Sequence, residues 1–208
     1  MSLFLTLEGP EGSGKSTQAP RVAQLLHSRG WNTLLTREPG GTPIGDQIRD
    51  VLHDLANTAM HPRTEALLYS ASRAQIVNEV VKPHLAAGGA VVCDRFFHST
   101  LAYQGYGQRL DLGILRGITA FATEGLLPDW ILLLDLPVEV GLERRRASGG
   151  EWNRLDAQEL AFHQRVREGY LAMAREEPER WCLIQANGTS DQVWQEIRRN
   201  LEAWLDRR

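Results

Sequence analysis

The stretch Leu3–Gln18, LFLTLEGPEGSGKSTQ, decides the fold of this chain. Its first six residues, Leu3–Glu8, are almost all apolar and predict a buried strand. The run that follows, Gly9–Ser16, matches the pattern G-x-x-x-x-G-K-[ST] residue for residue. A helical pattern begins directly after the run, and this strand–loop–helix order argues against a chance match. The stretch therefore predicts a phosphate-binding loop.

The composition of this loop suits the binding of a nucleoside triphosphate. Glycines let successive backbone N–H groups point at phosphate oxygens, and the helix beginning near Lys15 adds the positive end of its dipole. Lys15 is expected to reach the β- and γ-phosphates, and the Ser16 hydroxyl to ligate Mg²⁺. The residues expected to contact the nucleotide are Gly9, Pro10, Glu11, Gly12, Ser13, Gly14, Lys15, Ser16 and Thr17.

Length and charge limit the class of protein. The chain has 208 residues, a natural size for one α/β domain spanning residues 1–208. Its net charge of −3 gives no general attraction to nucleic acid or to an anionic membrane. The longest apolar run, Trp130–Leu136, is too short to span a bilayer. The two cysteines, Cys93 and Cys182, allow no disulfide framework, so we expect a cytoplasmic protein.

Short apolar runs alternate with helical periodicity along the whole chain. This order predicts an α/β fold with a five-stranded parallel sheet and helices on both faces. Ligands of such sheets bind in the loops after the strands, where polar clusters occur in this sequence. The expected strands are Leu3–Glu8, Asn32–Arg37, Ala90–Asp94, Trp130–Asp135 and Trp181–Ala186. The expected helices include Ser16–Arg29, Pro62–Leu85, Asp156–Arg175 and Asp191–Leu205.

The phosphate-binding loop alone does not distinguish a kinase from a switch GTPase, a motor ATPase or a passive nucleotide-binding module. A guanine-specific switch would carry an N-K-x-D motif, which the sequence lacks. A motor would be larger, with a strand that ends in a catalytic acid pair. The strand Ala90–Asp94 is instead followed by Arg95, which suits a second phosphate group rather than an attacking water. This favours phosphoryl transfer to a phosphorylated acceptor.

Five segments together resemble the thymidylate kinase family, whose members phosphorylate dTMP with ATP. The resemblance implies the P-loop nucleoside monophosphate kinase architecture, Mg²⁺ as cofactor, and a homodimer packed through helices such as those that carry Tyr69 and Phe121. The segments are LEGPEGSGKST, TREPGGTPIGDQIR (Thr36–Arg49), LLYSASRAQ (Leu67–Gln75), DRFFHSTLAYQG (Asp94–Gly105) and a basic segment at Arg144–Arg154.

The resemblance assigns several residues to the phosphate and sugar of dTMP. Glu11 is expected to accept a hydrogen bond from the 3′-hydroxyl, with a solvated loop residue as the alternative. Glu38 is expected to contact the sugar, and the peptide bond before Pro39 is typically cis in the family. Arg49 resembles the family's phosphate-binding arginine, although it also fits an ordinary solvated helix face.

The pair Asp94-Arg95 is expected to act beside this phosphate. Arg95 would bridge the acceptor phosphate toward the transferred group, because a guanidinium fits phosphate in a bidentate manner. Asp94 would hold Mg²⁺ through water or orient Arg95. A structural ion pair is the alternative reading.

The thymine base is assigned to a second group of residues. The resemblance places Tyr69 as the ring that stacks on thymine and Arg73 as a donor to a thymine carbonyl. The two residues are four apart on one helix and share a face. The alternative places Tyr69 in the core and pairs Arg73 with a nearby acid. Thr100 and Gln104 are expected to read the base edge, and Tyr103 to crowd the 2′ position of the sugar.

A lid is expected at Leu142–Asp156, LERRRASGGEWNRLD, around the Gly149-Gly150 hinge. Some family members carry an arginine in the phosphate loop, where this chain has Gly12, so the resemblance points to the bacterial subgroup in which lid arginines supply the charge. Arg154 and then Arg146 are the expected catalytic arginines, beside Lys15 and Arg95, and Arg144 is expected nearer ATP. An exposed basic loop is the alternative.

The sequence thus predicts an ATP- and Mg²⁺-dependent kinase that converts dTMP into dTDP for dTTP synthesis. Two other readings stay open. A deoxynucleoside kinase would act on thymidine rather than dTMP, and would have no use for two arginines at an acceptor phosphate. A non-catalytic P-loop module would bind nucleotide without turnover stimulated by an acceptor.

Overall fold

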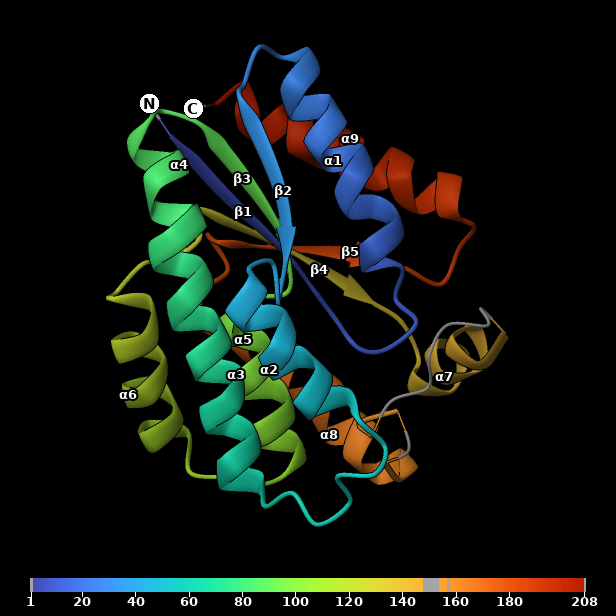
Figure 1. Ribbon diagram of the computed structural model, residues 1–208. Coiled ribbons are helices and arrows are strands. Elements are labelled where there is room, and N and C mark those ends of the chain that lie inside the picture. The colour runs from blue at the N-terminus through green and yellow to red at the C-terminus, as the bar shows by residue number, and fades with distance from the viewer. Residues whose placement is uncertain (1, 148–153, 157, 208) are drawn as a thin grey trace.

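The computed structural model describes residues 2–147, 154–156 and 158–207, and these form one parallel sheet flanked by helices (Figure 1). The strand order is β2-β3-β1-β4-β5. All pairings are parallel. The predicted fold class is therefore confirmed. The strands are β1 Leu3–Glu8, β2 Thr33–Arg37, β3 Ala90–Asp94, β4 Trp130–Asp135 and β5 Trp181–Gln185.

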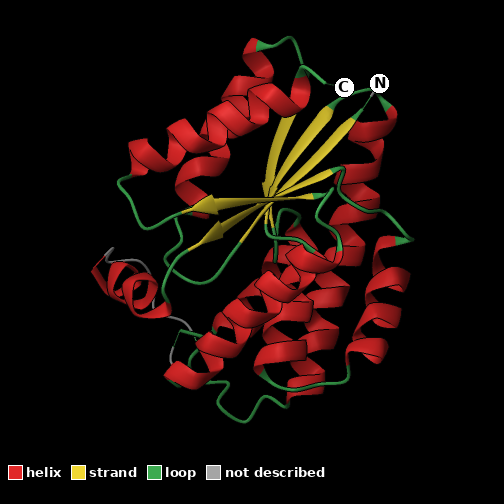
Figure 2. Ribbon diagram, turned by 180° about the vertical axis from the view of Figure 1, so that it is seen from behind, coloured by secondary structure: helices red, strands yellow, loops and turns green. Residues whose placement is uncertain are grey.

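Helices cover both faces of the sheet, as seen from behind in Figure 2. On one face α1 and α9 pack against Leu5 and Leu7 of β1. Phe4, which directly precedes Leu5 in the strand, points to the opposite face and packs with Ile76 and Phe96. The helical elements are α1 Lys15–Ser28, α2 Pro43–His53, α3 Pro62–Ile76, η1 Val77–Val81, α4 Lys82–Ala86, α5 Phe97–Thr100, η2 Leu101–Gly107, α6 Leu112–Thr123, α7 Val138–Ala147, α8 Leu160–Glu176 and α9 Ser190–Leu205.

Two helices differ from the sequence expectation. The helix expected from Asp156 begins only at Leu160, because the buried Asp156 carboxylate accepts hydrogen bonds from Arg145 within a turn. The helix expected at Pro62–Leu85 is continuous, but it consists of α3, the wider π-helical turn η1 and α4. Pro83, just beyond this turn, has no N–H with which to continue the regular ladder. In the described part of the chain, no helix is long and apolar enough to cross a membrane.

The sheet places the polar clusters of the sequence at one edge. Asp94 ends β3 and pairs in register with Arg37 of β2 and with Leu7 of β1. Glu8, which ends β1, lies beside Leu133 of β4. The loops that follow β1, β2 and β3 therefore open on the same side, which is where the site lies.

Candidate active site

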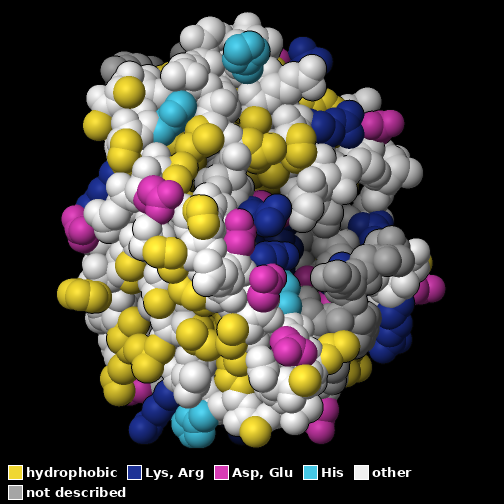
Figure 3. Space-filling view, in the orientation of Figure 1, with side chains coloured by type: hydrophobic (Ala, Val, Ile, Leu, Met, Phe, Trp, Pro, Cys, Tyr) yellow, Lys and Arg dark blue, Asp and Glu magenta, His cyan; other side chains and the backbone are white. Residues whose placement is uncertain are grey.

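A cavity of about 690 Å³ opens at this carboxyl edge of the sheet. Its volume is in the range usual for small-molecule sites. Figure 3 shows basic and acidic side chains gathered in the central hollow of the surface. Six cationic side chains line the cavity against three acidic ones, which suits a polyanionic ligand. The cations are Lys15, Arg37, Arg49, Arg95, Arg144 and Arg145, and the acids are Glu11, Glu38 and Asp94.

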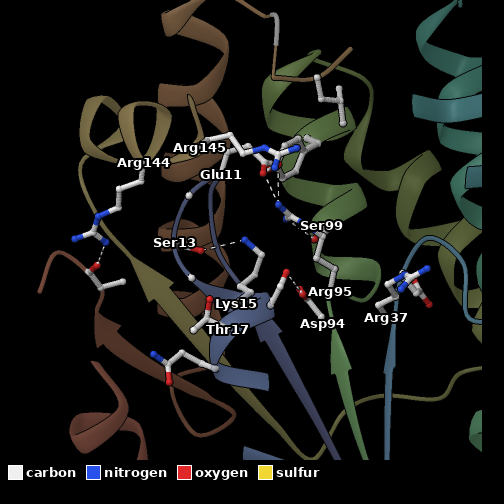
Figure 4. A pocket seen from close by; sticks show the side chains of 18 of the residues that line it. Glu11, Ser13, Lys15, Thr17, Arg37, Asp94, Arg95, Ser99, Arg144 and Arg145 are labelled. Carbon is white, nitrogen blue, oxygen red and sulfur yellow. Dashed lines mark hydrogen bonds and ion pairs between the residues drawn. The ribbon is translucent and has the colours of Figure 1, made fainter. Parts of the chain in front are cut away.

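The phosphate loop curls around the Lys15 ammonium group (Figure 4). Lys15 Nζ donates to the carbonyl oxygens of Gly9 and Pro10, each at 2.9 Å, and to Ser13 Oγ at 3.0 Å. Burial and the nearby Arg95 charge lower the pKa of Lys15, and the charge of Glu11 opposes them, which leaves that pKa at about 8. An anion that entered the loop would restore the favourable surroundings of the charged lysine.

Gly12 brings the phosphate loop against helix α7. A Cβ atom at Gly12 would lie 1.9 Å from the carbonyl oxygen of Gly141, and one at Gly141 would lie 2.3 Å from that of Glu11. Neither position has room for a side chain. Gly12 therefore lets the helix that carries Arg144 and Arg145 pack directly on the loop.

Ser16 and Asp94 meet beside the loop. Ser16 Oγ donates to Asp94 Oδ2 at 2.6 Å, and both residues line the cavity. Oxygen donors of this kind are those that Mg²⁺ prefers. Among the described residues there is no cluster of three or more histidine, cysteine or acidic side chains that could hold a metal. A magnesium ion here would therefore draw most of its ligands from phosphates and water, as is usual for nucleotide sites.

Arg95 lies at the centre of a hydrogen-bond network. Its Nη2 donates to Glu11 Oε1 at 2.8 Å and to the Tyr103 hydroxyl at 3.1 Å. The Tyr103 hydroxyl in turn donates to Glu11 at 2.8 Å. The guanidinium also lies over the Tyr103 ring, with 5.0 Å between Cζ and the ring centroid. These three residues, predicted separately for the acceptor, form one connected group.

Glu8 contacts this network through Ser99 and Tyr170, and it was not predicted from the sequence as a site residue. Its fully buried carboxylate accepts hydrogen bonds from the Phe96 backbone N–H at 2.8 Å, Ser99 Oγ at 2.6 Å and the Tyr170 hydroxyl at 3.0 Å. Ser99 and Tyr170 both lie 3.2 Å from Arg95 Nη1. Burial raises the pKa of Glu8, and these hydrogen bonds oppose the rise. A carboxylate at the end of an otherwise apolar strand is the signal that points to it.

Arg73 and Glu38 form a buried ion pair behind the cavity wall. Nε and Nη2 of Arg73 each lie 2.7 Å from Glu38 Oε2, and Nη1 donates to Thr100 Oγ1 at 3.1 Å. Burial raises the pKa of Glu38, and the charge of Arg73 opposes that rise. Arg73 thus pairs with an acid, as one part of the alternative had it, whereas Tyr69 lines the cavity rather than lying in the core. The expected role of Arg73 at the base stays a prediction. The Glu38–Pro39 peptide bond is cis, as the resemblance implied.

The remaining residues expected to bind the acceptor also line the cavity. They are Arg49, Tyr69, Tyr103 and Gln104, together with Pro39. Arg49 Nη1 donates to the Pro39 carbonyl oxygen at 3.0 Å, which holds it beside the turn after β2. Gln104 Nε2 donates to Glu65 Oε1 at 2.6 Å.

The lid arginines separate into two groups. Arg144 lines the cavity and donates to the carbonyl oxygens of Ala186, Asn187 and Gly188 at 2.6, 2.8 and 3.0 Å. Arg145 lines it as well and pairs with Asp156 at 3.0 Å. Arg145 was not singled out from the sequence, because three consecutive arginines give no indication of which ones face the site.

The two lid arginines expected to be catalytic, Arg154 and Arg146, are not among the residues that line the cavity. Arg154 forms an ion pair with Glu65 of α3. Arg146 lies exposed on the last turn of α7. The Gly149-Gly150 hinge and the rest of positions 148–153 lie outside the described residues. Their expected roles stay predictions.

Other cavity residues were not predicted at all. His53 of α2 and Ser99 of α5 lie on the acceptor side, and Gln18, Ser190 and Val193 lie beside the phosphate loop. Burial and the neighbouring Arg49 lower the pKa of His53 to about 4, so this imidazole is neutral at physiological pH. Gln18 and Ser99 lie within the quoted segments Leu3–Gln18 and Asp94–Gly105 without being singled out, whereas His53, Ser190 and Val193 lie outside every motif and reach the site only through the fold.

Comparison with known proteins agrees with this geometry. The thymidylate kinase family model matches residues 7–197. A thymidylate kinase from Roseiflexus castenholzii is 51% identical over 217 residues, covering 99% of this chain and 95% of the relative. One from Thermomicrobium roseum is 51% identical over 198 residues, covering 93% of each.

A solved structure shows the same fold. The crystal structure of thymidylate kinase from Ehrlichia chaffeensis superposes with a TM-score of 0.78 at 30% sequence identity, covering 96% of this chain and 98% of that one. The match extends over nearly all of both chains, and the family model spans the phosphate loop, the acceptor residues and the lid arginines. The chain belongs to the thymidylate kinase family.

Proposed function

We propose that this protein transfers the γ-phosphoryl group of ATP to dTMP, giving dTDP and ADP. The observation that carries the proposal is the single cavity in which the Lys15 loop faces Arg49 and Arg95. One cavity with two separate sets of cations suits two phosphorylated ligands held end to end. The family membership supports dTMP as the acceptor.

The donor half of the site binds and neutralises ATP. The backbone N–H groups of the loop after Pro10, in the range 11–17, and the Lys15 ammonium hold the β- and γ-phosphates, and Arg144 binds farther along the nucleotide. Ser16 and Asp94 hold Mg²⁺, which when bound neutralises charge on the phosphates. Arg145, near the start of the lid, lines the cavity and adds positive charge near Glu11 and the transferred group.

The acceptor half orients dTMP for in-line attack. Arg95 and Arg49 hold its phosphate, and Glu11 and Glu38 lie on the side of the sugar. Tyr69 stacks on the base, while Tyr103 leaves no room for a 2′-hydroxyl. Thr100, Gln104 and Arg73 complete the base pocket. Because phosphoryl transfer relies on positioning and electrostatics, this arrangement needs no protein nucleophile.

Arg154 and Arg146 are proposed to supply lid charge when both substrates are bound. Arg154 forms an ion pair with Glu65, and Glu65 in turn accepts a hydrogen bond from Gln104, which lines the acceptor half of the cavity. A positive side chain beside the transferring phosphoryl group stabilises the negative charge of the transition state, and this lowers the activation barrier substantially in related phosphoryl transfers. A role in dTTP synthesis follows from membership of the thymidylate kinase family. Cytoplasmic location stays a prediction.

We also propose a homodimer formed through α2, α3 and α6. Large apolar side chains of these helices are exposed, namely Ile44, Val51, Leu67, Ile114 and Phe121. Phe121 is 85% exposed and Ile114 is 65% exposed, on one face of α6 seven residues apart. Figure 3 shows hydrophobic side chains gathered over the region of α3 and α6. A contiguous apolar surface of this kind suits contact with a second copy.

The testing experiment measures ADP production from ATP with dTMP, dUMP, UMP, CMP, AMP or thymidine as acceptor, with and without EDTA. We expect the highest turnover with dTMP and its loss on chelation of Mg²⁺. Turnover with thymidine but not dTMP would establish a deoxynucleoside kinase. ATP binding without turnover on any acceptor would leave only a nucleotide-binding module.

A further inference from the structure

Glu65 is a buried carboxylate that belongs to none of the site motifs. It lies on α3 and is not among the residues that line the cavity. Its Oε1 accepts hydrogen bonds from Gln104 Nε2 at 2.6 Å and from Gln108 Nε2 at 2.7 Å. Its Oε2 forms an ion pair with Arg154. One carboxylate therefore joins a base-pocket residue to the lid.

This contact fixes which end of the Gln104 amide faces the ligand. A carboxylate paired with an arginine only accepts hydrogen bonds, so Gln104 must turn its NH₂ group toward Glu65. Its carbonyl oxygen Oε1 is then left for the cavity that Gln104 lines. Within the described residues, Gln104 Oε1 has no hydrogen-bond partner. It is not fully buried, whereas Oε1 of Gln108 is both fully buried and unpaired.

We propose that Glu65 is a specificity-determining positioning residue, which holds Gln104 as an acceptor and so selects a pyrimidine that carries a proton on N3. The inference rests on the proposed function. Thymine and uracil present an N3–H donor between two carbonyl oxygens. Cytosine presents an unprotonated N3 acceptor beside an amino group, so it would face Gln104 with two acceptors in opposition.

The neighbouring donors complete a matched pattern. Arg73 donates to Thr100, which precedes Gln104 by one helical turn on the same wall. Arg73 has five N–H groups, and its contacts with Glu38 and Thr100 leave some of them unused. The N–H donors of Arg73 beside the Gln104 Oε1 acceptor match thymine, in which a carbonyl oxygen lies next to N3–H. They oppose cytosine, which has an amino group at the place of that carbonyl oxygen.

The test replaces the carboxylate without changing its shape. In Glu65→Gln the new amide can donate to Gln104 Oε1, so Gln104 is free to turn its NH₂ group toward the cavity. We expect the ratio of kcat/KM for dTMP over dCMP to fall about tenfold or more, because an unpaired polar group no longer penalises cytosine. KM for ATP is expected to stay unchanged.

Two matched variants separate orientation from charge and packing. Arg154→Met removes the ion pair but keeps the Glu65 carboxylate, so kcat falls while the dTMP/dCMP ratio holds. Gln108→Met removes the second amide on the same oxygen, and leaves both activity and the ratio near those of the unaltered protein. Should Glu65→Gln fail to fold, the double variant Glu65→Gln/Arg154→Met leaves no unpaired charge and is compared with Arg154→Met alone.

The outcomes separate this inference from the proposed function. Unaltered protein that turns over dTMP, with a ratio that falls only when Glu65 loses its charge, supports both. A ratio unchanged in Glu65→Gln, or in the double variant relative to Arg154→Met, overturns the role of Glu65 and leaves the kinase intact. Absence of dTMP turnover in the unaltered protein overturns both.

Discussion

Arg95 and Glu11 form an ion pair across the mouth of the phosphate loop, with 2.8 Å between Arg95 Nη2 and Glu11 Oε1 and each side chain 17% exposed. Burial alone would raise the pKa of Glu11. The charges of Arg95 and Lys15 and the hydrogen bond from Tyr103 outweigh burial and lower that pKa to about 2. Glu11 is therefore ionised at physiological pH and is able to accept a hydrogen bond from a sugar hydroxyl.

Replacement of Arg95 tests the acceptor half of the site. In Arg95→Met we expect kcat/KM for dTMP to fall about 10³-fold or more, the range seen for arginines that stabilise a transferring phosphoryl group. Steady-state kinetics measures it, with circular dichroism to verify the fold. The matched control is Arg116→Met, which removes an exposed ion pair with Glu176 away from the cavity. A loss of less than about tenfold in Arg95→Met would contradict the assignment.

The lowered pKa of Lys15 makes ATP binding depend on pH. The free protein loses the Lys15 proton near pH 8, whereas the phosphates of ATP favour the charged lysine, so binding takes up a proton above that pH. Affinity is full below about pH 8 and falls as the pH rises, by up to about tenfold for each pH unit.

Isothermal titration at pH 7.5 and 9.5, in buffers of different ionisation enthalpy, measures this proton uptake directly. Lys15→Arg serves as the control, because a guanidinium stays charged over the whole range. Equal proton uptake at both pH values in the unaltered protein would show that Lys15 does not titrate in this window.

The contiguous parts of the site were predictable from the sequence, because their chemistry is local. The loop Gly9–Ser16 carries its own glycines, lysine and hydroxyl, so its pattern identifies it before any fold is known. Asp94-Arg95 is likewise read from a strand end. The structure confirms that these segments meet in one cavity, since parallel strands present their carboxyl ends at one edge.

What the sequence could not supply is the set of partners that cross the fold. Glu65 and Arg154 are separated by 89 residues, and Glu8 and Tyr170 by 162. No pattern along the chain relates such residues, because the contacts are created by tertiary packing: α3 meets the turn at 154–156, and α8 meets the end of β1. Arg145 was missed for a different reason. The phase of the short helix α7, which follows β4, decides which of three consecutive arginines face inward, and both Arg144 and Arg145 do.

The buried pair Arg73–Glu38 is expected to stabilise the fold as well as shape the base pocket. Either Arg73→Met or Glu38→Gln alone leaves an unmatched buried group, and we expect Arg73→Met to cost about 3–5 kcal/mol of unfolding free energy. The double variant is expected to lose less than the sum of the two single losses, because it leaves no buried charge unpaired. Urea unfolding of all four proteins measures this coupling. Strict additivity would mean that the two side chains act independently.

The apolar face of α6 is expected to hold two copies together. Phe121→Asp places a charge where the proposed interface would bury the most exposed aromatic ring of the chain's described part. The unaltered protein is then expected to sediment with about twice the 23.3 kDa of one chain, and the variant with the mass of one. Leu160→Asp, on α8 and 43% exposed, is the matched control that introduces the same charge elsewhere and leaves the dimer intact. Sedimentation equilibrium at micromolar concentration decides between the two. A monomeric unaltered protein would reject the dimer, whereas a dimeric Phe121→Asp variant would place the interface on another face.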